Sequence, residues 1–473
     1  MRFMSEISGR KFYAYLLLSV LVLFGCKKDK TPPNDQPLTT PVALDASAIA
    51  TSSFVAHWEE VAAASSYDLF VATDSNFTSP VANYNPKVVT GLYDSVKGLA
   101  AKTNYFYRLI AEDGSGKKSE KSNTIKVSVP DSSSDGYVYV GSMDGVLYCF
   151  SAVNGQKNWS YKTAGGIEGS PTIKDGMVII TSSDQRTYSL NPLTGALNWF
   201  SLTGGAIITS PATGAGFVFV ANDSGNVIGM DIASGFKRWN VQPFGNSFIF
   251  SSPTYSNGTV YVGSEDFSLY ALDALTGATK WSAPTGNFVV SSPAVANGIV
   301  YVGSRDRYLY AFDAGTGSLK WKTITNDSIV SSPTIDSGIV YVGSFDNQVH
   351  AFDGATGVIK WATTTGGRVQ SSPTVSNGIV YAGSFDNKLY AFDSKTGAIK
   401  WTATTGDRIL SSPVVSNGTV YVGSMDNKLY ALDAVTGAVK WTAATGAGIR
   451  VSSPAVLTYK GASSLASISG DKQ

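Results

Sequence analysis

Apolar and polar positions alternate along the last two-thirds of the chain, in a pattern that repeats about every 40 residues. Residues 371–407 form one clear unit, in which the alternation marks four short runs at 373–376, 379–383, 388–392 and 398–402. A period of two is typical of β-strands whose two faces meet different surroundings. Each repeat is therefore predicted to contain four short strands.

Turns of characteristic composition connect these runs. Asn-Gly at 377–378 joins the first two runs, and this pair is a strong signal for a two-residue hairpin. Ser-Phe-Asp-Asn at 384–387 leads from the second run to the third, and Lys-Thr-Gly at 395–397 leads from the third to the fourth. A four-stranded meander of this length is typical of one blade of a β-propeller.

A tryptophan stands in the fourth run of every repeat. Seven intervals separate the eight tryptophans, six of 40 residues and one of 42. A fixed period of this length indicates stacked supersecondary units, and the nearly uniform intervals leave little room for inserted catalytic machinery. The eight are Trp159, Trp199, Trp239, Trp281, Trp321, Trp361, Trp401 and Trp441.

The tryptophan ends a longer motif, Ala-x-Asp-x-x-Thr-Gly-x-x-x-Trp, which is clear in the last five units and degraded in the earlier ones. Over residues 137–458 the repeats resemble the tryptophan-docking motif of eight-bladed propellers related to pyrroloquinoline quinone enzymes. The resemblance implies that each indole packs between neighbouring blades, over the small residue and the turn glycine. A large flat ring needs a small neighbour to leave space for it.

Both ends of the repeat region are incomplete. The first unit begins at Tyr137 with the second strand of the pattern, and the last unit continues past Trp441 into a first strand at 452–456. The C-terminal strand is therefore predicted to complete the N-terminal blade and close a ring of eight, which removes exposed sheet edges. Residues 459–473 are rich in Ser and Gly and are predicted to form a loose tail.

Residues 38–130 have a different periodicity. Residues 53–58, 67–71 and 105–111 alternate over short runs with turns between them, which is typical of an antiparallel sandwich. Trp58, the run Leu-Ala-Ala-Lys-Thr-Asn-Tyr ending at Tyr105, and the closing stretch 119–129 resemble a fibronectin type III domain. The resemblance implies a spacer or adhesion module, in which the Leu packs inward and the Tyr hydroxyl bonds nearby backbone.

The predicted fold class is thus all-β, a fibronectin type III-like sandwich followed by a closed eight-bladed propeller with four-stranded blades. Residues 131–136 are predicted to link the two domains.

Residues 1–26 have the features of a targeting segment. A basic start precedes the apolar run 12–24, and the segment ends in Leu-Phe-Gly-Cys at Cys26. This ending resembles a bacterial lipobox, which implies that Cys26 is acylated and anchors an exported protein to a membrane. An uncleaved N-terminal anchor is the alternative. Residues 27–37 are charged and Pro-rich, as in a tether. The charges resemble signals that direct lipoproteins to the outer membrane, on its periplasmic side or the cell surface.

Composition excludes several functions. The chain has 473 residues and a net charge of +1, which gives no electrostatic footprint for nucleic acid. Its two cysteines, Cys26 and Cys149, cannot form a disulfide framework, and Cys149 occupies the small-residue position of its repeat. Two histidines, His57 and His350, lie in different domains and cannot form a multi-histidine metal site. No metal or cofactor is expected.

The direction of the strands assigns each loop to one of the two faces of the propeller. The Asn-Gly and Thr-Gly turns lie on one face and barely vary, whereas the turns between second and third strands and the blade crossovers lie on the other face and vary. Arg and aromatic residues on the variable face fit protein binding or stacking against sugars, with ordinary loop surface as the alternative. The candidate binding residues are Arg305, Arg307, Tyr308, Phe345, Arg368, Phe385, Arg408 and Arg450.

Other repeated residues are interpreted as structural. An Asp recurs in the variable-face turns, and a local turn hydrogen bond is favoured over a cation site. The repeated Ser-Ser-Pro is interpreted as strand-entry chemistry and not as a set of nucleophiles. The turn carboxylates are Asp144, Asp184, Asp266, Asp306, Asp346, Asp386 and Asp426.

Three functions remain open. Compact repeats of this kind resemble the lipoprotein subunit of the outer-membrane β-barrel assembly machinery, which implies a non-catalytic protein that binds an envelope partner through its loops. The sandwich domain departs from that family's plan. Carbohydrate binding at the cell surface is the first alternative. Pyrroloquinoline quinone-dependent dehydrogenation is the second, but that family needs a calcium and commonly an adjacent cysteine pair, and Cys149 stands alone.

Overall fold

The computed structural model describes residues 38–50, 52–101, 103–129, 136–243, 245, 247–460 and 464–469. Every element in this part of the chain is a β-strand, so the prediction of an all-β fold is confirmed. Correspondingly, these ranges contain no helix of the length and hydropathy that crossing a bilayer would need. The predicted targeting segment with Cys26, the tether, and residues 131–135 of the linker lie outside the described residues.

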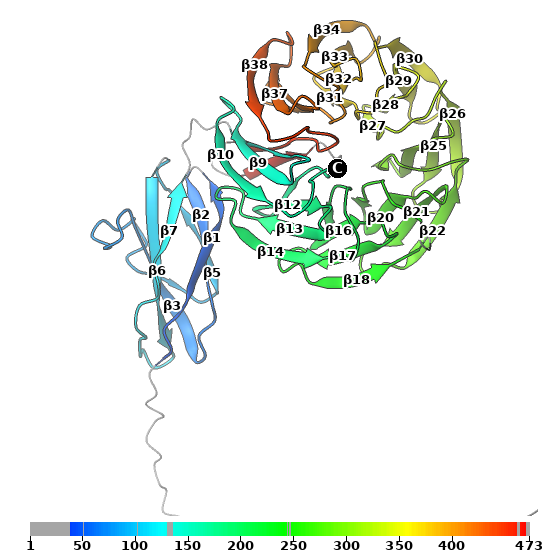
Figure 1. The fold of residues 1–473 in the computed structure, drawn as a ribbon. Coiled ribbons are helices and arrows are strands. Elements are labelled where there is room, and N and C mark those ends of the chain that lie inside the picture. The colour runs from blue at the N-terminus through cyan, green and yellow to red at the C-terminus, as the bar shows by residue number, and fades with distance from the viewer. Residues whose placement is uncertain are drawn as a thin grey trace, which may run out of the picture.

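The first β unit is a two-sheet sandwich with its own apolar core (Figure 1). One sheet has the order β1 (Ala43–Ala50), β2 (Ser53–Trp58), β5 (Tyr93–Lys97). The other has the order β4 (Lys87–Val89), β3 (Ala64–Ala72), β6 (Thr103–Asp113), β7 (Ile125–Val129). Trp58 and Leu99 are buried in the core, and the Ala100 N–H donates to the Tyr105 hydroxyl at 2.7 Å. This contact fixes the corner that leads into β6.

The repeat region forms eight antiparallel sheets around a central axis, numbered here in chain order (Figure 1). Sheet 1 has the order β10 (Lys157–Lys162), β9 (Val146–Ser151), β8 (Tyr137–Gly141), β39 (Ala455–Lys460), β40 (Ser464–Ser469). Sheet 2 has β11 (Thr172–Lys174), β12 (Met177–Ser182), β13 (Arg186–Leu190) and β14 (Leu197–Leu202). Sheet 3 has β15 (Ala212–Gly214), β16 (Phe217–Ala221), β17 (Val227–Asp231) and β18 (Lys237–Val241).

The remaining five sheets have the same four-stranded order. Sheet 4 has β19 (Thr254–Ser256), β20 (Thr259–Gly263), β21 (Ser268–Asp273) and β22 (Thr279–Pro284). Sheet 5 has β23 (Ala294–Ala296), β24 (Ile299–Gly303), β25 (Tyr308–Asp313) and β26 (Leu319–Ile324). Sheet 6 has β27 (Thr334–Asp336), β28 (Ile339–Gly343), β29 (Gln348–Asp353) and β30 (Ile359–Thr364). Sheet 7 has β31 (Thr374–Ser376), β32 (Ile379–Gly383), β33 (Lys388–Asp393) and β34 (Ile399–Thr404). Sheet 8 has β35 (Val414–Ser416), β36 (Thr419–Ser424), β37 (Lys428–Asp433) and β38 (Val439–Ala444).

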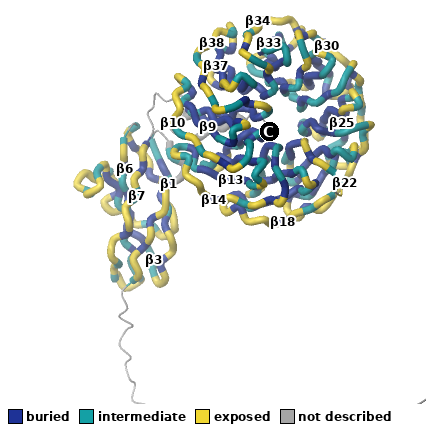
Figure 2. Tube along the Cα trace, viewed as in Figure 1, coloured by how far each residue is buried: buried dark blue, intermediate teal, exposed yellow. Residues whose placement is uncertain are grey.

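The first hairpin of each sheet follows from its turn residues. Between β31 and β32, Asn377 has φ 49° and Gly378 has φ 75°, so both central residues are left-handed. That is the turn type whose twist matches the flanking strands, and Asn-Gly is its preferred sequence. Figure 2 shows that the strands between these turns are largely buried, while the outer strands and turns are exposed.

The two ends of the repeat region meet in sheet 1. Strand β39 pairs antiparallel with β8, with Ala455 opposite Tyr139 and Leu457 opposite Tyr137. The structure differs from the sequence prediction in the tail, because β39 extends to Lys460 and β40 pairs with it. Sheet 1 therefore has five strands and not four. Backbone pairing along β39 supplies the partners that Ser and Gly composition alone does not reveal.

The tryptophans connect each sheet to the next one. In sheet 6, Ala351 lies directly between Tyr341 and Trp361 on adjacent strands, and the two rings meet over it with centroids 5.8 Å apart. The Trp361 indole N–H and the Tyr341 hydroxyl both donate to the Ser394 carbonyl of sheet 7, at 3.0 and 3.1 Å. A Cβ on Gly397 of sheet 7 would lie 2.7 Å from the Trp361 ring, so only glycine fits there.

The same indole bond recurs around all eight sheets at 2.9–3.2 Å. The Trp441 indole of sheet 8 donates to Ala152 of sheet 1 at 3.1 Å, and its ring lies against Gly155. The accepting carbonyls, in chain order of the tryptophans, belong to Pro192, Ile232, Ala274, Ala314, Gly354, Ser394, Ala434 and Ala152. The contact is thus continuous from the last sheet to the first.

A second set of inter-sheet bonds surrounds the axis. The backbone N–H of each serine in this set donates to the Oγ of its equivalent in the next sheet at 2.9–3.0 Å, and Ser453 donates back to Ser170. We call this set the serine ring. Its members are Ser170, Ser210, Ser252, Ser292, Ser332, Ser372, Ser412 and Ser453. The ring satisfies backbone groups where the strands crowd together, a role beyond the strand entry expected for Ser-Ser-Pro.

Replacement of Trp361 by Ala should lower the free energy of unfolding by about 3–5 kcal/mol, because a buried aromatic side chain is lost and a cavity opens between sheets 6 and 7. Trp361→Phe is the matched control, since it keeps a ring there and Tyr341 still bonds the Ser394 carbonyl. Its cost should be smaller. Denaturant unfolding followed by circular dichroism measures both, and a wild-type midpoint for Trp361→Ala would disprove inter-sheet packing as the source of stability.

Candidate functional site

The variable face is formed by the turns between second and third strands and by the crossovers between sheets. These loops are bonded to each other through their backbones. The Phe385 N–H donates to the Arg368 carbonyl at 2.9 Å, and the Met425 N–H donates to the Arg408 carbonyl at 3.0 Å. Equivalent bonds join Arg305 to Phe288 and Phe345 to Ser328, both at 3.0 Å. The side chains of this face therefore extend from ordered backbone.

Four of the predicted binding residues form one continuous group across sheets 6 to 8. The Arg368 guanidinium lies over the Phe345 ring at 5.0 Å from its centroid, and that of Arg408 lies over Phe385 at 5.6 Å. The two phenyl rings are 6.2 Å apart and tilted by 56°. Both arginines are exposed, whereas both phenylalanines are partly buried. We call Phe345, Arg368, Phe385 and Arg408 the Arg–Phe strip.

The other four predicted residues do not join this strip. Arg305 lies over Phe288 at 5.6 Å, in a second stacked pair beside sheet 5. Arg450 forms an ion pair at 2.9 Å with Glu168, which lies in the crossover before sheet 2, so its charge has a partner within the chain. Arg307 is exposed in the turn before β25, at φ 80°. Tyr308 is partly buried at the start of β25, with the Lys322 ammonium 4.7 Å from its ring centroid.

The turn carboxylates are occupied by local contacts. Asp386 accepts the Lys388 N–H at 3.1 Å and the Tyr390 hydroxyl at 2.6 Å, and it accepts the Gly366 N–H from the crossover before it at 3.0 Å. The bond to a Tyr four residues later, at 2.5–2.7 Å, recurs in six of the seven aspartates. These carboxylates hold the turns in place and are not directed into a common site.

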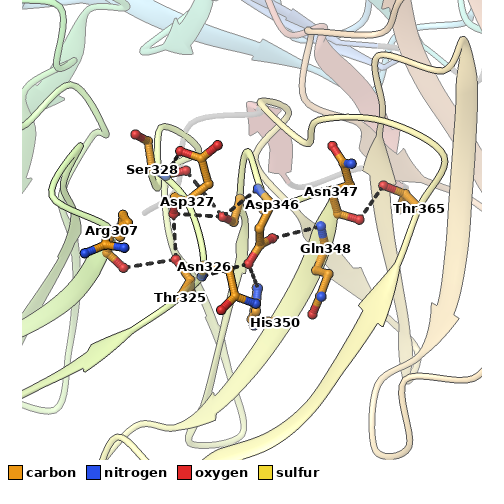
Figure 3. Close-up of polar contacts among 12 residues, drawn as sticks. Arg307, Thr325, Asn326, Asp327, Ser328, Asp346, Asn347, Gln348, His350 and Thr365 are labelled. Carbon is orange, nitrogen blue, oxygen red and sulfur yellow. Dashed lines mark hydrogen bonds and ion pairs between the residues drawn. The ribbon is translucent and has the colours of Figure 1, made fainter.

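Asp346 is the exception, because His350 takes the place of the tyrosine (Figure 3). The His350 Nε2 lies 2.9 Å from Asp346 Oδ2, and both side chains are 4% exposed. The Gln348 and Asn326 N–H groups also donate to this carboxylate. Burial raises the pKa of Asp346, but the hydrogen bond and charge of His350 and the backbone donors outweigh it, so the pKa lies below its usual value.

A funnel of about 350 Å³ opens on the axis of the variable face, above the serine ring. It is lined by the serine ring, by the residue two positions before each of these serines, and by the predicted binding residues Arg305 and Arg450. The position two residues before the serine is not among the predicted binding residues. Six of these eight residues are apolar, and that recurrence was the available signal. The eight are Glu168, Ile208, Phe250, Val290, Val330, Gln370, Leu410 and Val451.

The residues present do not fit a calcium-bound quinone. No group of three or more His, Cys, Asp or Glu side chains within the described ranges is arranged to hold a metal ion. The turn carboxylates are committed to hydroxyl and backbone donors. Burial raises the pKa of the Cys149 thiol, which lies between Tyr139 and Trp159 in sheet 1. Cys149 therefore acts as a small buried residue under an aromatic pair.

Comparison with known proteins places the repeats in a family. A family model described as outer membrane protein assembly factor BamB matches residues 114–242, 201–291, 289–368 and 362–471, together more than half of the chain. A search of curated protein sequences finds no match.

Solved structures share the propeller architecture. BamB from Moraxella catarrhalis is 23% identical, with a TM-score of 0.52 over 65% of this chain and 93% of that one. The computationally designed protein Ika8 is 18% identical, with a TM-score of 0.57 over 63% of this chain and 93% of that one. Quinohemoprotein alcohol dehydrogenase from Comamonas testosteroni is 15% identical, with a TM-score of 0.52 over 62% of this chain and 70% of that one. Identities this low support the fold alone.

Replacement of Asp346 by Asn should cost about 1–3 kcal/mol at neutral pH, since it weakens a buried acceptor of several donors. The carboxylate's pKa is depressed in the folded state, so its contribution is present above the unfolded value of 3.8 and is lost as pH falls through the lower folded value. The difference between variant and wild type should therefore shrink below about pH 4. His350→Tyr, which introduces the residue that six other sheets have at this position, should unfold at or above the wild-type midpoint. A pH-independent difference between Asp346→Asn and wild type would contradict the linkage.

Proposed function

The chain belongs to the family of outer membrane protein assembly factor BamB, and from this premise we propose that it is a non-catalytic binding and scaffold protein of the bacterial envelope. In this proposal the variable face of the repeat region binds a protein partner. The observation that carries it is the Arg–Phe strip, where exposed guanidinium groups stack on partly buried phenyl rings. Arg and aromatic residues are the types enriched at the centres of protein interfaces.

The proposed architecture is a closed eight-bladed propeller preceded by a fibronectin type III domain. The pairing of β39 with β8, the serine ring and the indole bond from Trp441 to Ala152 support closure. The buried Trp58 and the Tyr105 corner support the fibronectin assignment. In this arrangement the first domain is a spacer between the propeller and the membrane.

The proposed location is the outer membrane, through a lipid anchor on Cys26. The support is the lipobox-like end of the targeting segment and the membrane named in the family description. Several acyl chains on one residue would hold the protein firmly on a membrane surface.

Carbohydrate binding is the second candidate, and one specific observation favours it. Phe248, Phe250 and Phe267 are 52%, 42% and 43% exposed, and Phe248 and Phe250 form a stacked pair. Exposed aromatic faces suit stacking against sugars. Dehydrogenase activity has less support, because the donor set described above does not fit a calcium and quinone, although a quinohemoprotein dehydrogenase shares the fold.

Replacement of Arg368 and Arg408 together by Ala should leave the thermal unfolding midpoint unchanged, because neither side chain fills the core. It should reduce the amount of partner recovered by crosslinking from membranes by about 10-fold, the effect of losing a small number of interface contacts. Arg238→Ala is the matched control, since Arg238 also stacks on a phenyl ring, Phe236, but lies at the start of an outer strand. Equal recovery from the double variant and wild type would remove the Arg–Phe strip as the binding site, and glycan retention without a protein partner would favour the second candidate.

A further inference from the structure

We propose that the Arg–Phe strip recognises a short acidic segment of a protein, in which carboxylate side chains stand beside apolar ones. The inference rests on the proposed function, because it assigns a chemistry to the partner of the same face. Its basis is the charge, order and surroundings of Arg368 and Arg408.

The positive charge of the strip is mostly unpartnered within the described residues. Among the residues that the structure describes, no carboxylate lies within 4.0 Å of the Arg368 guanidinium, and Arg408 has one such neighbour, Asp407 at 3.8 Å, with both side chains about half exposed. An exposed pair at that separation contributes little. The guanidinium groups therefore retain most of their capacity for a carboxylate from outside.

The nearest turn carboxylates do not bind the guanidinium groups of Arg368 and Arg408. Asp346 and Asp386 are bound by His350 and Tyr390, respectively, and by backbone N–H groups. Asp426 is bound in the same way by Tyr430 and the Gly406 N–H. These contacts orient the carboxylates toward their own turns. The aspartates thus stabilise the loops without neutralising the arginines above them.

The strip is ordered before any partner binds. Each arginine is fixed at its carbonyl by a backbone bond and at its guanidinium by a phenyl ring. An ordered side chain loses less conformational entropy on binding, so more of the interaction energy appears as affinity. A planar guanidinium can also present two parallel N–H groups to one carboxylate, which a lysine cannot do.

The phenyl rings favour apolar side chains next to the carboxylates of the bound segment. Phe345 and Phe385 are tilted at 56° to each other, and each ring lies under one of the two arginines. The ring surface not covered by a guanidinium offers an apolar contact directly beside each charge. A segment that alternates acidic and apolar side chains can use the charge and the ring of each pair, which a uniformly charged segment cannot do.

A long polyanion does not match the face. The positive strip is short, Asp407 lies beside Arg408 within it, and the carboxylates of Asp327 and Glu265 lie outside it on the same face. Burial raises the pKa of Glu265, while the positive charge of Arg305 opposes that effect. A polysulfated or polyphosphate chain needs an uninterrupted track of cations, so an acidic protein segment is the occupant that the charges favour.

The test measures binding of the full chain to two synthetic peptides with Gly-Ser flanks, one with the centre Glu-Leu-Glu-Phe and one with Gln-Leu-Gln-Phe. The wild type should bind the Glu peptide about 10-fold more tightly than the Gln peptide, and this preference should weaken as salt is added. Arg368→Glu with Arg408→Glu should abolish the preference. Arg368→Lys with Arg408→Lys should keep part of it, because charge is retained and the planar fork is lost.

Arg238→Glu is the matched control and should bind both peptides as the wild type does. Equal affinity of the wild type for both peptides would overturn the inference. It would also be overturned if the wild type bound dextran sulfate more tightly than the Glu peptide and the charge-reversed double variant lost that binding. Crosslinking from membranes separates the two proposals. A partner recovered equally by the wild type and the charge-reversed protein would leave the proposed function standing and refute the acidic segment. Recovery of no protein partner, with the peptide preference intact, would refute the proposed function alone.

Discussion

The structure depends on one constraint, which is that eight small sheets must each bury a face against a neighbour without leaving polar backbone unpaired. A tryptophan meets both requirements at once. Its ring fills the space between sheets, and its N–H satisfies a carbonyl in the next turn, as Trp361 does for Ser394. The small residue at Ala351 and the glycine at Gly397 are consequences, since a larger side chain at either place would overlap an aromatic ring.

Two sets of hydrogen bonds join neighbouring sheets, at different distances from the central axis. The indole bonds lie in the outer strands, and the serine ring lies at the axis. A sheet held at both ends cannot rotate against its neighbours without breaking bonds in each set. The loops of the variable face therefore sit on a rigid frame, and preorganised loops are a favourable base for binding. This frame explains why neighbouring guanidinium and phenyl groups from different sheets keep a fixed order.

Much of this fold could be predicted from the sequence, because its determinants are local and repeated. The Asn-Gly hairpins, the strand alternation and the tryptophan period each report a contact within one repeat or between adjacent repeats. The eight-residue wall of the axial funnel was missed, because no single repeat shows that the residues before Ser-Ser-Pro converge. The candidate binding residues were chosen by face alone, and only the structure separates Arg368 and Arg408 from Arg450, whose partner Glu168 lies far away in sequence. The pairing of β40 was likewise hidden in a Ser- and Gly-rich tail.

Within each variable turn, the residues that hold the backbone differ from the residue whose side chain faces the surface. This difference shows why the face can acquire new partners. In the sequence Ser-x-Asp, the serine and aspartate side chains hold the turn, and the residue x contributes only its backbone N–H to the neighbouring crossover. The side chain of x takes no part in holding the backbone of the turn. Arg305, Phe345, Phe385 and Met425 all occupy this position in successive sheets, with the same backbone bond in each. Substitution at x changes the chemistry of the surface while the frame stays constant, so specificity in this fold is expected to reside at x and at the crossover residue that it contacts.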